Sequence, residues 1–489
     1  MTGEIRPLHS ERPTPLPWTR LETVVIGVLL VSAIVAHFWH LGVPDSFVYD
    51  EHIYVDEAYK YLRGEAFFEV HPPFAIILIT ACTWLFGCHP WSWRVPSAVL
   101  GSALIPITYL LARRMFHSRR AAALASLLVL CEGMFLSYSR LALINIVYIT
   151  LGAASYLALF RFMESRDLRD RRRSLVLMGA CLGLGLGSKL AIPAIAVLLA
   201  IGFILAGLLP SSFFARGTDP EGPGSIDLSY AVGAIVLVAG VSGFFFFLTF
   251  LPNYLIGWWT GISSVTNYYQ RVYVANAVYP SPPSHQDSPW WSWPLLLRPY
   301  KYWQKMDDSG MYLALWGGGN PAIWWAALVA IVIAGIRAVQ RYGIAWAFLS
   351  VGYLLYMAMW IPVHRALYLY CYMPAFYLGI LALAGVLDSC WRETARIWEQ
   401  LALLLPVVTV SLLGMGYLYG AIASVLCIGG FLALRLFSNW SGKYVTTVVV
   451  VTSIAVFLFY LPMWLPLPLT ESGVQARIWL DQSDLVSWK

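Results

Sequence analysis

The chain has 489 residues, of which 59% are hydrophobic and 12% are charged, and its formal net charge is +6. Soluble domains usually contain about 25% charged residues, so this composition, with a mean hydropathy of +0.67, excludes an ordinary water-soluble protein. The apolar runs are continuous rather than alternating, which argues against an outer-membrane β-barrel. The composition therefore predicts an all-α polytopic membrane protein.

The first 73 residues divide into a tail, a membrane helix and an acidic loop. Residues 1–20 are polar and predict a cytoplasmic tail, and the apolar run 21–41 is long enough to cross a bilayer. No small-residue cleavage site follows this run, which predicts an uncleaved helix rather than a signal peptide. Residues 42–73 contain seven acidic side chains but only Lys60 and Arg63 as cations, which favours an external loop.

Further apolar runs follow along the rest of the chain. They cover residues 74–87, 95–112, 121–136, 141–162, 175–189, 191–209, 228–251, 321–338, 344–361, 366–387, 401–415, 417–436 and 444–465. Basic residues cluster at 113–120, 161–173, 337–341 and 392–396, and the positive-inside rule places these loops in the cytoplasm. This arrangement requires residues 74–93 to form a non-spanning or re-entrant helix. We therefore expect about 11 to 14 transmembrane helices, with about 13 as the best estimate.

The runs predict two transmembrane modules joined by an external segment. Residues 21–251 form the N-terminal catalytic module with its external loop 42–73, and residues 252–320 form an external loop rich in aromatic residues, which favour the membrane interface. Residues 321–465 form the C-terminal module, and residues 466–489 form an external tail. The two external loops lie on the same side and are expected to form the active site.

Carboxylates and cations occur at the predicted external ends of these helices. The Asp50-Glu51 pair follows the first helix, where a carboxylate can act as a general base in a partly dehydrated pocket. A solvated acidic loop is the alternative, and Asp56-Glu57 is a second such pair. Four cations stand where a lipid phosphate would lie, although each could instead extend to the membrane interface: Arg94, Arg140, Lys189 and Arg365.

Other patterns favour structural roles. Gly183 to Lys189 resembles a phosphate-binding loop but lacks the Gly-Lys-Ser order and belongs to an apolar run. The four-residue spacing of Gly179, Gly183 and Gly187 instead predicts a close helix–helix contact. The seven cysteines lie mostly within apolar runs and show no disulfide framework or metal-ligand spacing.

Several short motifs occur in a fixed order: Asp50-Glu51, His71-Pro72-Pro73, Trp93-Arg94, Ser139-Arg140, Gly187-Ser188-Lys189, residues 290–295, Gly319-Asn320-Pro321, and Arg365 followed by residues 368–374. Their order and spacing resemble the protein O-mannosyltransferase family, which consists of glycosyltransferases of the GT-C fold that use polyprenyl-phosphate or dolichyl-phosphate sugars. The chain departs from the family at Glu69 (Asp in the family), at Phe74-Ala75-Ile76 (Leu-Gly-Lys) and at Asn145 (Asp), and it keeps only His285 of a His-rich acceptor loop. No β-trefoil (MIR) insertion fits between residues 252 and 320, so the resemblance is to compact, prokaryotic-type members.

The resemblance implies a membrane glycosyltransferase that moves a sugar, most simply mannose, from a polyprenyl-phosphate carrier to a hydroxyl group with inversion. The acceptor would be Ser or Thr of an exported protein. Asp50 and Glu51 would be the catalytic pair, with Asp50 as the base and Glu51 orienting the loop. The expected phosphate-binding residues are Arg94, Lys189, Arg365 and Arg140, and the expected support residues of the loop or acceptor site are His71, His285, Trp290 and Tyr368.

No tightly bound cofactor is expected, because the lipid-linked sugar is itself the donor substrate. No ligand set for a divalent metal is indicated, although one could accompany the donor phosphate. The expected partners are this donor, an exported protein or glycolipid acceptor and the bilayer, without nucleic acid. We expect a plasma or inner membrane location with the active site on the extracytoplasmic face. Two alternatives stay open. One is the same fold acting on a lipid or polysaccharide acceptor, as in aminoarabinose transferases; the other is a transporter or flippase without chemistry, although no inverted repeat is visible.

Overall fold

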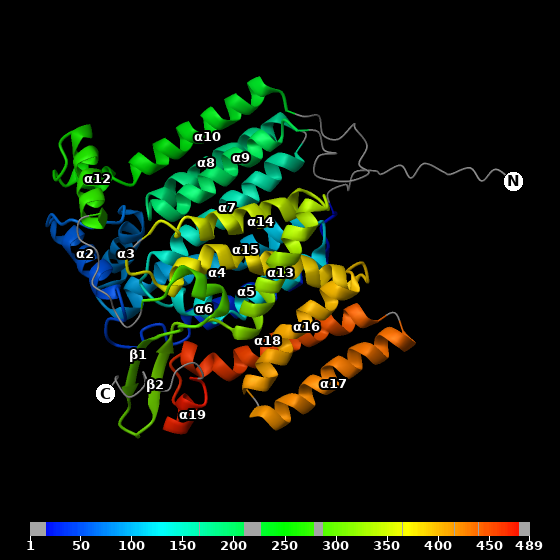
Figure 1. Cartoon of the computed structure of the whole chain (residues 1–489). Coiled ribbons are helices and arrows are strands. Elements are labelled where there is room, and N and C mark those ends of the chain that lie inside the picture. Colours follow the sequence, from blue (N-terminus) through cyan, green and yellow to red (C-terminus); the bar gives the residue numbers. More distant parts are fainter. Residues whose placement is uncertain are drawn as a thin grey trace.

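The computed structural model describes residues 16–165, 167–209, 226–277, 287–363, 365–414, 416–438 and 440–478. Within these ranges the protein is mostly helical, and its long helices run side by side while short elements collect at one end of the bundle (Figure 1). In the described part of the chain, eight helices are long and apolar enough to cross a membrane, and shorter apolar helices accompany them. The prediction of an all-α polytopic membrane protein is confirmed.

The helices of spanning length are α1 (Arg20–Phe38), α4 (Pro90–Phe116), α7 (Asn145–Glu164), α10 (Leu228–Leu248), α13 (Pro321–Val339), α15 (Met373–Trp391), α17 (Gly416–Phe437) and α18 (Ser441–Trp464). The other α-helices are α2 (Glu51–Arg63), α3 (Phe74–Phe86), α5 (Arg119–Leu130), α6 (Gly133–Tyr138), α8 (Leu168–Leu186), α9 (Ala191–Ala206), α11 (Leu251–Leu255), α12 (Ile262–Ala277), α14 (Ile344–Ala358), α16 (Ile397–Gly414) and α19 (Glu471–Gln475). Two 3-10 helices, η2 (Trp290–Leu295) and η3 (Leu369–Tyr372), and an antiparallel hairpin of β1 (Lys301–Met306) and β2 (Tyr312–Trp316) complete the described structure.

Most apolar runs of the sequence overlap one helix, but the run 366–387 begins before η3 and α15, the run 228–251 extends from α10 to α11, and the run 121–136 is divided between α5 and α6. The division falls at Cys131-Glu132, where the Glu132 carboxylate caps α6 by accepting a hydrogen bond from the Phe135 amide (3.0 Å). The run after the two prolines forms α3, which has 13 residues. A helix of this length extends about 20 Å, which is less than the hydrocarbon core of about 30 Å. The helix formed by residues 74–86 is therefore too short to cross the membrane by itself.

The glycine series of α8 packs closely against α10. A Cβ atom at Gly183 would lie 2.3 Å from the carbonyl oxygen of Ser242, and one at Gly187 would lie 2.5 Å from Cγ2 of Thr249. The Ser242 hydroxyl donates a hydrogen bond to the Gly179 carbonyl oxygen (3.0 Å). Because a larger side chain would push the two helices apart, the predicted close contact through Gly179, Gly183 and Gly187 is confirmed.

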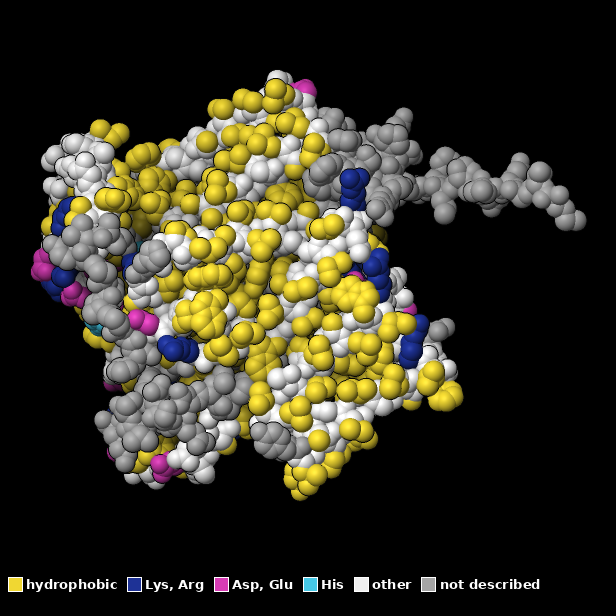
Figure 2. All heavy atoms as spheres, in the orientation of Figure 1, with side chains coloured by type: hydrophobic (Ala, Val, Ile, Leu, Met, Phe, Trp, Pro, Cys, Tyr) yellow, Lys and Arg dark blue, Asp and Glu magenta, His cyan; other side chains and the backbone are white. Residues whose placement is uncertain are grey.

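Ion pairs join the helix ends that carry the arginine-rich loops. Glu22, at the start of α1, accepts hydrogen bonds from Arg113 (2.6 Å) and Arg119 (2.9 Å), and Asp388 of α15 pairs with Arg120 (3.2 Å). In Figure 1 the short elements α2, α3 and α12 and the β-hairpin lie together at one end of the bundle. Figure 2 shows hydrophobic side chains covering the middle of the visible face, with most charged side chains toward its two ends, as expected for a surface in contact with lipid.

Candidate functional site

A backbone contact brings two distant motifs together. The amide of Phe74, at the start of α3, donates a hydrogen bond to the carbonyl oxygen of Gly187 (2.8 Å). This bond holds the His71-Pro72-Pro73 turn against the segment between α8 and α9 that contains Lys189. Asp50 stands directly before α2, which packs on α3. The charge of Lys189 acts on both Asp50 and His71, so three predicted site residues lie in one electrostatic environment.

Lys189 is a buried cation enclosed by aromatic rings. Its Nζ lies 5.1 Å from the ring centroid of Tyr370 and 5.7 Å from that of Tyr148. Within the described ranges no carboxylate forms an ion pair with this amine. Burial lowers the pKa of Lys189, and the charge of Asp50 opposes this effect. Cation–π contacts stabilise the charge in a partly dehydrated place, so Lys189 is suited to bind an anionic group.

Asp50 lies beside a group of tyrosines that come from the two external loops and from the segment between α14 and α15. Tyr49 has a left-handed φ of +55°, and its ring packs within 6.5 Å (between centroids) of the four other rings of this tyrosine cluster: Tyr300, Tyr302, Tyr368 and Tyr370. Burial raises the pKa of Asp50, while Lys189 and His52 oppose the rise. A base whose pKa lies closer to neutrality accepts a proton more readily, and the nearby cation keeps it ionised.

Glu51 and Arg94 form an ion pair beneath this site, and both side chains are 0% exposed. Nε and Nη2 of Arg94 each lie 2.8 Å from an oxygen of Glu51. The three remaining N–H groups donate to the carbonyl oxygens of Leu41 (3.1 Å), Pro44 (2.9 Å) and Ser46 (3.0 Å). All five guanidinium donors are therefore occupied. Arg94, which was expected to hold a phosphate, instead fastens the loop that leads to Asp50.

Glu51 also accepts hydrogen bonds from the amides of Val48 (2.9 Å) and Ala142 (2.8 Å). Its two oxygens are thus engaged by Arg94 and by backbone groups on either side of the loop. Glu51, which was expected in the catalytic pair, therefore has an orienting position, and Asp50 is the member of that pair whose charge acts on Lys189.

Arg140, which was also expected to bind the phosphate, contacts main-chain carbonyl groups. Its buried guanidinium donates to the carbonyl oxygens of Ala36 (2.8 Å) and His37 (3.2 Å) in the last turn of α1, and to that of His40 (3.4 Å) just after the helix. The carbonyl groups of the last turn have no partner within the helix, and a cation is favourable at a helix C-terminus. Arg365, by contrast, is exposed, and its charge acts on His71 and Lys189.

The remaining predicted site residues, His71, Tyr368, Trp290 and His285, differ in where they lie. The His71 amide donates to the Glu69 carboxylate (3.3 Å), and burial, with Lys189 and Arg365, lowers the pKa of His71 well below its usual value. Tyr368 is part of the tyrosine cluster. Trp290 begins η2 and packs against the core. His285 lies outside the described residues.

The tryptophan motif of residues 290–295 anchors α13. The Trp293 carbonyl oxygen accepts a hydrogen bond from Nε1 of Trp324 (2.7 Å), and Trp293 is fully buried. The Asn320 side chain caps α13 by accepting from the Ala322 amide (3.1 Å), and Pro321 occupies the first helical position. These two motifs thus fix the C-terminal module against the external loop rather than supplying reactive groups.

A cavity of about 210 Å³ opens between the loop before α3 and the α11–α12 segment. Its walls combine aromatic and polar side chains, among them Phe67, Phe68, Trp258, Trp259, Tyr268, Glu69, His71, Asn253, Asn267 and Arg271. The charge of Asp50 acts on Glu69, so this cavity adjoins the Asp50 centre. The sequence did not single out Asn253 or Arg271, because one polar residue in an aromatic loop has no distinguishing pattern.

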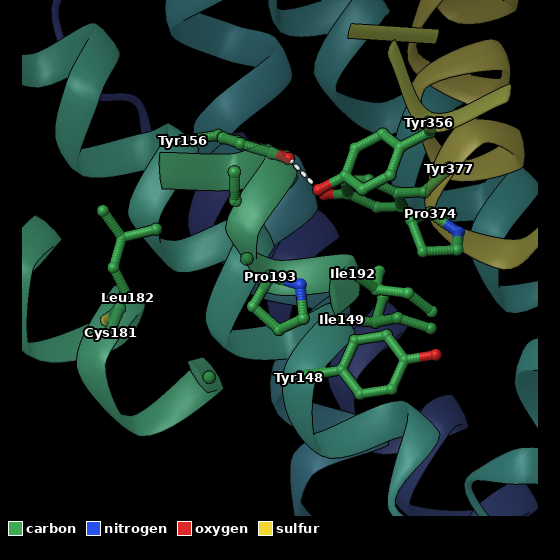
Figure 3. Close-up of a pocket in the computed structure, with 13 residues that line it drawn as sticks. Tyr148, Ile149, Tyr156, Cys181, Leu182, Ile192, Pro193, Tyr356, Pro374 and Tyr377 are labelled. Carbon is green, nitrogen blue, oxygen red and sulfur yellow. Dashed lines mark hydrogen bonds between the residues drawn. The ribbon is translucent and has the colours of Figure 1, made fainter. Parts of the chain in front are cut away.

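A second cavity lies inside the bundle among α7, α8, α9, α14 and α15 (Figure 3). The hydroxyl groups of Tyr156 and Tyr356 are hydrogen-bonded across it (2.6 Å). Its volume of about 20 Å³ is close to the space that one water needs, so it is too small for a sugar. Among the described residues, no group of three or more His, Cys, Asp or Glu side chains is placed to hold a metal ion.

The fold is shared with solved membrane glycosyltransferases. The chain matches the structure of the Saccharomyces cerevisiae protein O-mannosyltransferase Pmt1-Pmt2 complex bound to the sugar donor, with a TM-score of 0.74 and 14% identity over 95% of this chain and 93% of that chain. It also matches ArnT from Cupriavidus metallidurans bound to undecaprenyl phosphate, with a TM-score of 0.58 and 15% identity over 91% and 76% of the two chains. The expected GT-C fold is confirmed.

Three family models match the chain in order. Two are described as dolichyl-phosphate-mannose-protein mannosyltransferase and match residues 27–94 and 70–215; the third is described as the C-terminal four-helix membrane region of protein-O-mannosyltransferase and matches residues 269–483. Together they cover most of the chain, which belongs to the protein O-mannosyltransferase family.

Named relatives agree with this assignment. The chain is 24% identical over 425 residues to the polyprenol-phosphate-mannose–protein mannosyltransferase of Mycobacterium tuberculosis, an alignment that covers 74% of this chain and 80% of the relative. The corresponding protein of Mycolicibacterium smegmatis is 25% identical, with 74% and 81% coverage.

Proposed function

We propose that this protein transfers mannose from a polyprenyl-phosphate carrier to a Ser or Thr hydroxyl group of an exported protein. The observation that carries the proposal is the buried Lys189 beside Asp50, with the charge of Arg365 acting on the same place. A base and a phosphate-binding cation are the two groups that this transfer needs. The names of the family models and relatives support the donor and the protein acceptor.

In the proposed reaction, Asp50 removes the proton of the acceptor hydroxyl while that oxygen attacks the anomeric carbon of the sugar. The bond between this carbon and the phosphate oxygen breaks, and the configuration is inverted. Lys189 and Arg365 stabilise the polyprenyl phosphate as negative charge develops on it. The phosphate is already a good leaving group, so no side chain has to protonate it.

The other predicted residues position these groups. The buried pair of Glu51 and Arg94 holds the backbone before Asp50, and Arg140 fixes the end of α1. The low pKa of His71 keeps its imidazole neutral, so His71 adds no positive charge to that of Lys189. The site lies at the bundle end away from the arginine-rich loops, and we place it on the extracytoplasmic face of the cell membrane on the basis of the positive-inside rule.

The acceptor class is tested in membranes that contain the wild-type protein, Asp50→Asn or Asp56→Asn, supplied with radiolabelled polyprenyl-phosphate-mannose and cell-envelope acceptors. Asp56 is a matched control because it is an acidic residue of the same loop that pairs with Lys60 at the surface (2.6 Å). We expect label in protein for the wild type and Asp56→Asn, and none for Asp50→Asn. Label in lipid alone would refute the protein acceptor and favour an acceptor of the aminoarabinose-transferase kind; transfer by Asp50→Asn at the wild-type rate would refute the role of Asp50.

A further inference from the structure

Two glutamates that the proposed reaction does not use meet beside the 210 Å³ cavity. Glu57 lies on α2, and its side chain is 5% exposed. Glu69 lies in the loop before α3 and lines the cavity. Their carboxyl groups are placed to share a hydrogen bond, because the buried Oε2 atom of Glu57 has no other partner among the described residues; Glu69 also accepts the His71 amide (3.3 Å). Two carboxyl groups in direct contact cannot both be charged, so the pair holds one proton.

The surroundings of Glu57 and Glu69 favour the singly protonated state of the pair. Burial, followed by the charge of Glu69, raises the pKa of Glu57 to about 10, and burial also raises the pKa of Glu69. Neither carboxyl group forms an ion pair with a cation of the described residues. The titratable and charged groups that face the pair or its cavity come from α2, the following loop, the Lys189 segment and α12: Asp50, Tyr54, Asp56, Lys60, Tyr61, His71, Lys189, Tyr268 and Arg271.

Position 76 of the cavity wall is apolar, because Ile76 lines the same cavity as Glu69. No lysine of the described lining can therefore neutralise Glu69. Glu57 supplies a neutral hydrogen-bond donor instead, so that the wall of the cavity has one negative charge rather than two.

We propose that Glu57 and Glu69 act as a singly protonated pair that binds the acceptor polypeptide. Glu57 is the positioning residue, and Glu69 accepts a hydrogen bond from an amide or hydroxyl group of the polypeptide in the cavity. This inference rests on the proposed transferase function, because it assigns the cavity to the acceptor of that reaction.

The chemistry of the walls agrees with a polypeptide as ligand. Trp258 and Trp259 offer broad apolar surfaces, while Asn253 and Asn267 offer amide donors and acceptors, a combination found where proteins bind peptides. Arg271, stacked on Phe68 (4.0 Å to the ring centroid), lines the same cavity. A second negative charge would lie near Asp50 and would repel the donor phosphate.

The kinetic test compares Glu57→Gln, Glu57→Leu and the control Glu65→Gln, using a Ser/Thr peptide and polyprenyl-phosphate-mannose. Glu65 is exposed and pairs with Arg63. We expect Glu57→Leu to raise the KM for the peptide about tenfold or more with the KM for the donor unchanged, and we expect Glu57→Gln, whose amide still donates to Glu69, to stay near wild type. The wild-type KM for the peptide should rise as the pair loses its proton at alkaline pH, and Glu57→Gln should abolish this rise. An unchanged peptide KM in Glu57→Leu would refute the proposal.

Infrared difference spectra test the shared proton without turnover. At pH 8 the wild type should show the C=O stretch of a protonated carboxylic acid that Glu57→Gln lacks and Glu65→Gln retains. Transfer without this band would refute the pair and leave the transferase function intact. The band without any mannose transfer would refute the proposed function and, with it, the assignment of the cavity to the acceptor, while the shared proton would stand.

Discussion

Replacing Arg94 with Met tests whether this residue stabilises the fold or binds the donor phosphate. The change would leave the Glu51 carboxylate buried without its cation, and the carbonyl oxygens of Leu41, Pro44 and Ser46 without their donors. Breaking a buried ion pair from one side costs about 3–5 kcal/mol of folding free energy. Because the buried carbonyl groups of Leu41 and Pro44 and the partly buried one of Ser46 lose a hydrogen bond as well, at about 1 kcal/mol or more for each buried group, we expect a loss at or above the upper end of that range. The double variant Glu51→Gln/Arg94→Met should recover part of it, because no charge is then left buried.

The assay is denaturant or thermal unfolding of the purified protein in one detergent, together with the KM for the donor. Arg63→Met is a matched control: Arg63 pairs with Glu65 at 2.7 Å, but both side chains are 52% exposed, and an exposed pair of this kind contributes little. Arg94→Met should lower the stability and kcat while the KM for the donor stays unchanged; Arg63→Met should change none of these. Wild-type stability together with a raised KM for the donor in Arg94→Met would refute the structural role and restore the expected contact with phosphate.

Two further predictions concern the cation and the helix packing. Lys189→Met should raise the KM for the donor at every pH. The pKa of Lys189 is lowered, so in the wild type the amine loses its proton at a lower pH than an ordinary lysine, and donor affinity should fall over that pH range. Lys189→Arg should remove this fall, because arginine keeps its charge. A fall that persists in Lys189→Arg would contradict the assignment of Lys189 to the donor phosphate. Gly183→Ala should lower stability by about 1–3 kcal/mol, because its Cβ would lie 2.3 Å from a backbone oxygen of α10. Gly240→Ala on α10, with no atom within 4 Å of the added Cβ, should leave unfolding unchanged; equal effects of the two variants would refute the packing argument.

The membrane helices could be predicted because their signal is local. A continuous apolar run has few conformations available in a bilayer, so runs such as 321–338 and 444–465 correspond to α13 and α18. Helix α2 was not predicted, because residues 51–63 mix acidic, basic and apolar residues. A signal was nevertheless present, since the buried Tyr54, Ala58 and Tyr61 lie three or four positions apart.

The chemistry of the site could be predicted only in part. The order of motifs indicated Asp50, His71 and Lys189, and the hydrogen bond from Phe74 to Gly187 brings their segments together. The partners of Arg94 and Arg140 are mostly main-chain carbonyl groups, and a sequence does not show where these point. The contact of Glu57 with Glu69 depends on how α2 turns back toward α3, which side-chain types alone do not specify.

The most direct test of the proposed reaction is the comparison of turnover and donor affinity in the purified wild type and Asp50→Asn, with a Ser/Thr peptide as acceptor. Asn cannot accept the proton but keeps the size of Asp. The proposed role of Asp50 as the base predicts a loss of kcat of about 10²–10⁴-fold with the Kd for polyprenyl-phosphate-mannose unchanged. Turnover within about tenfold of wild type would contradict this role for Asp50.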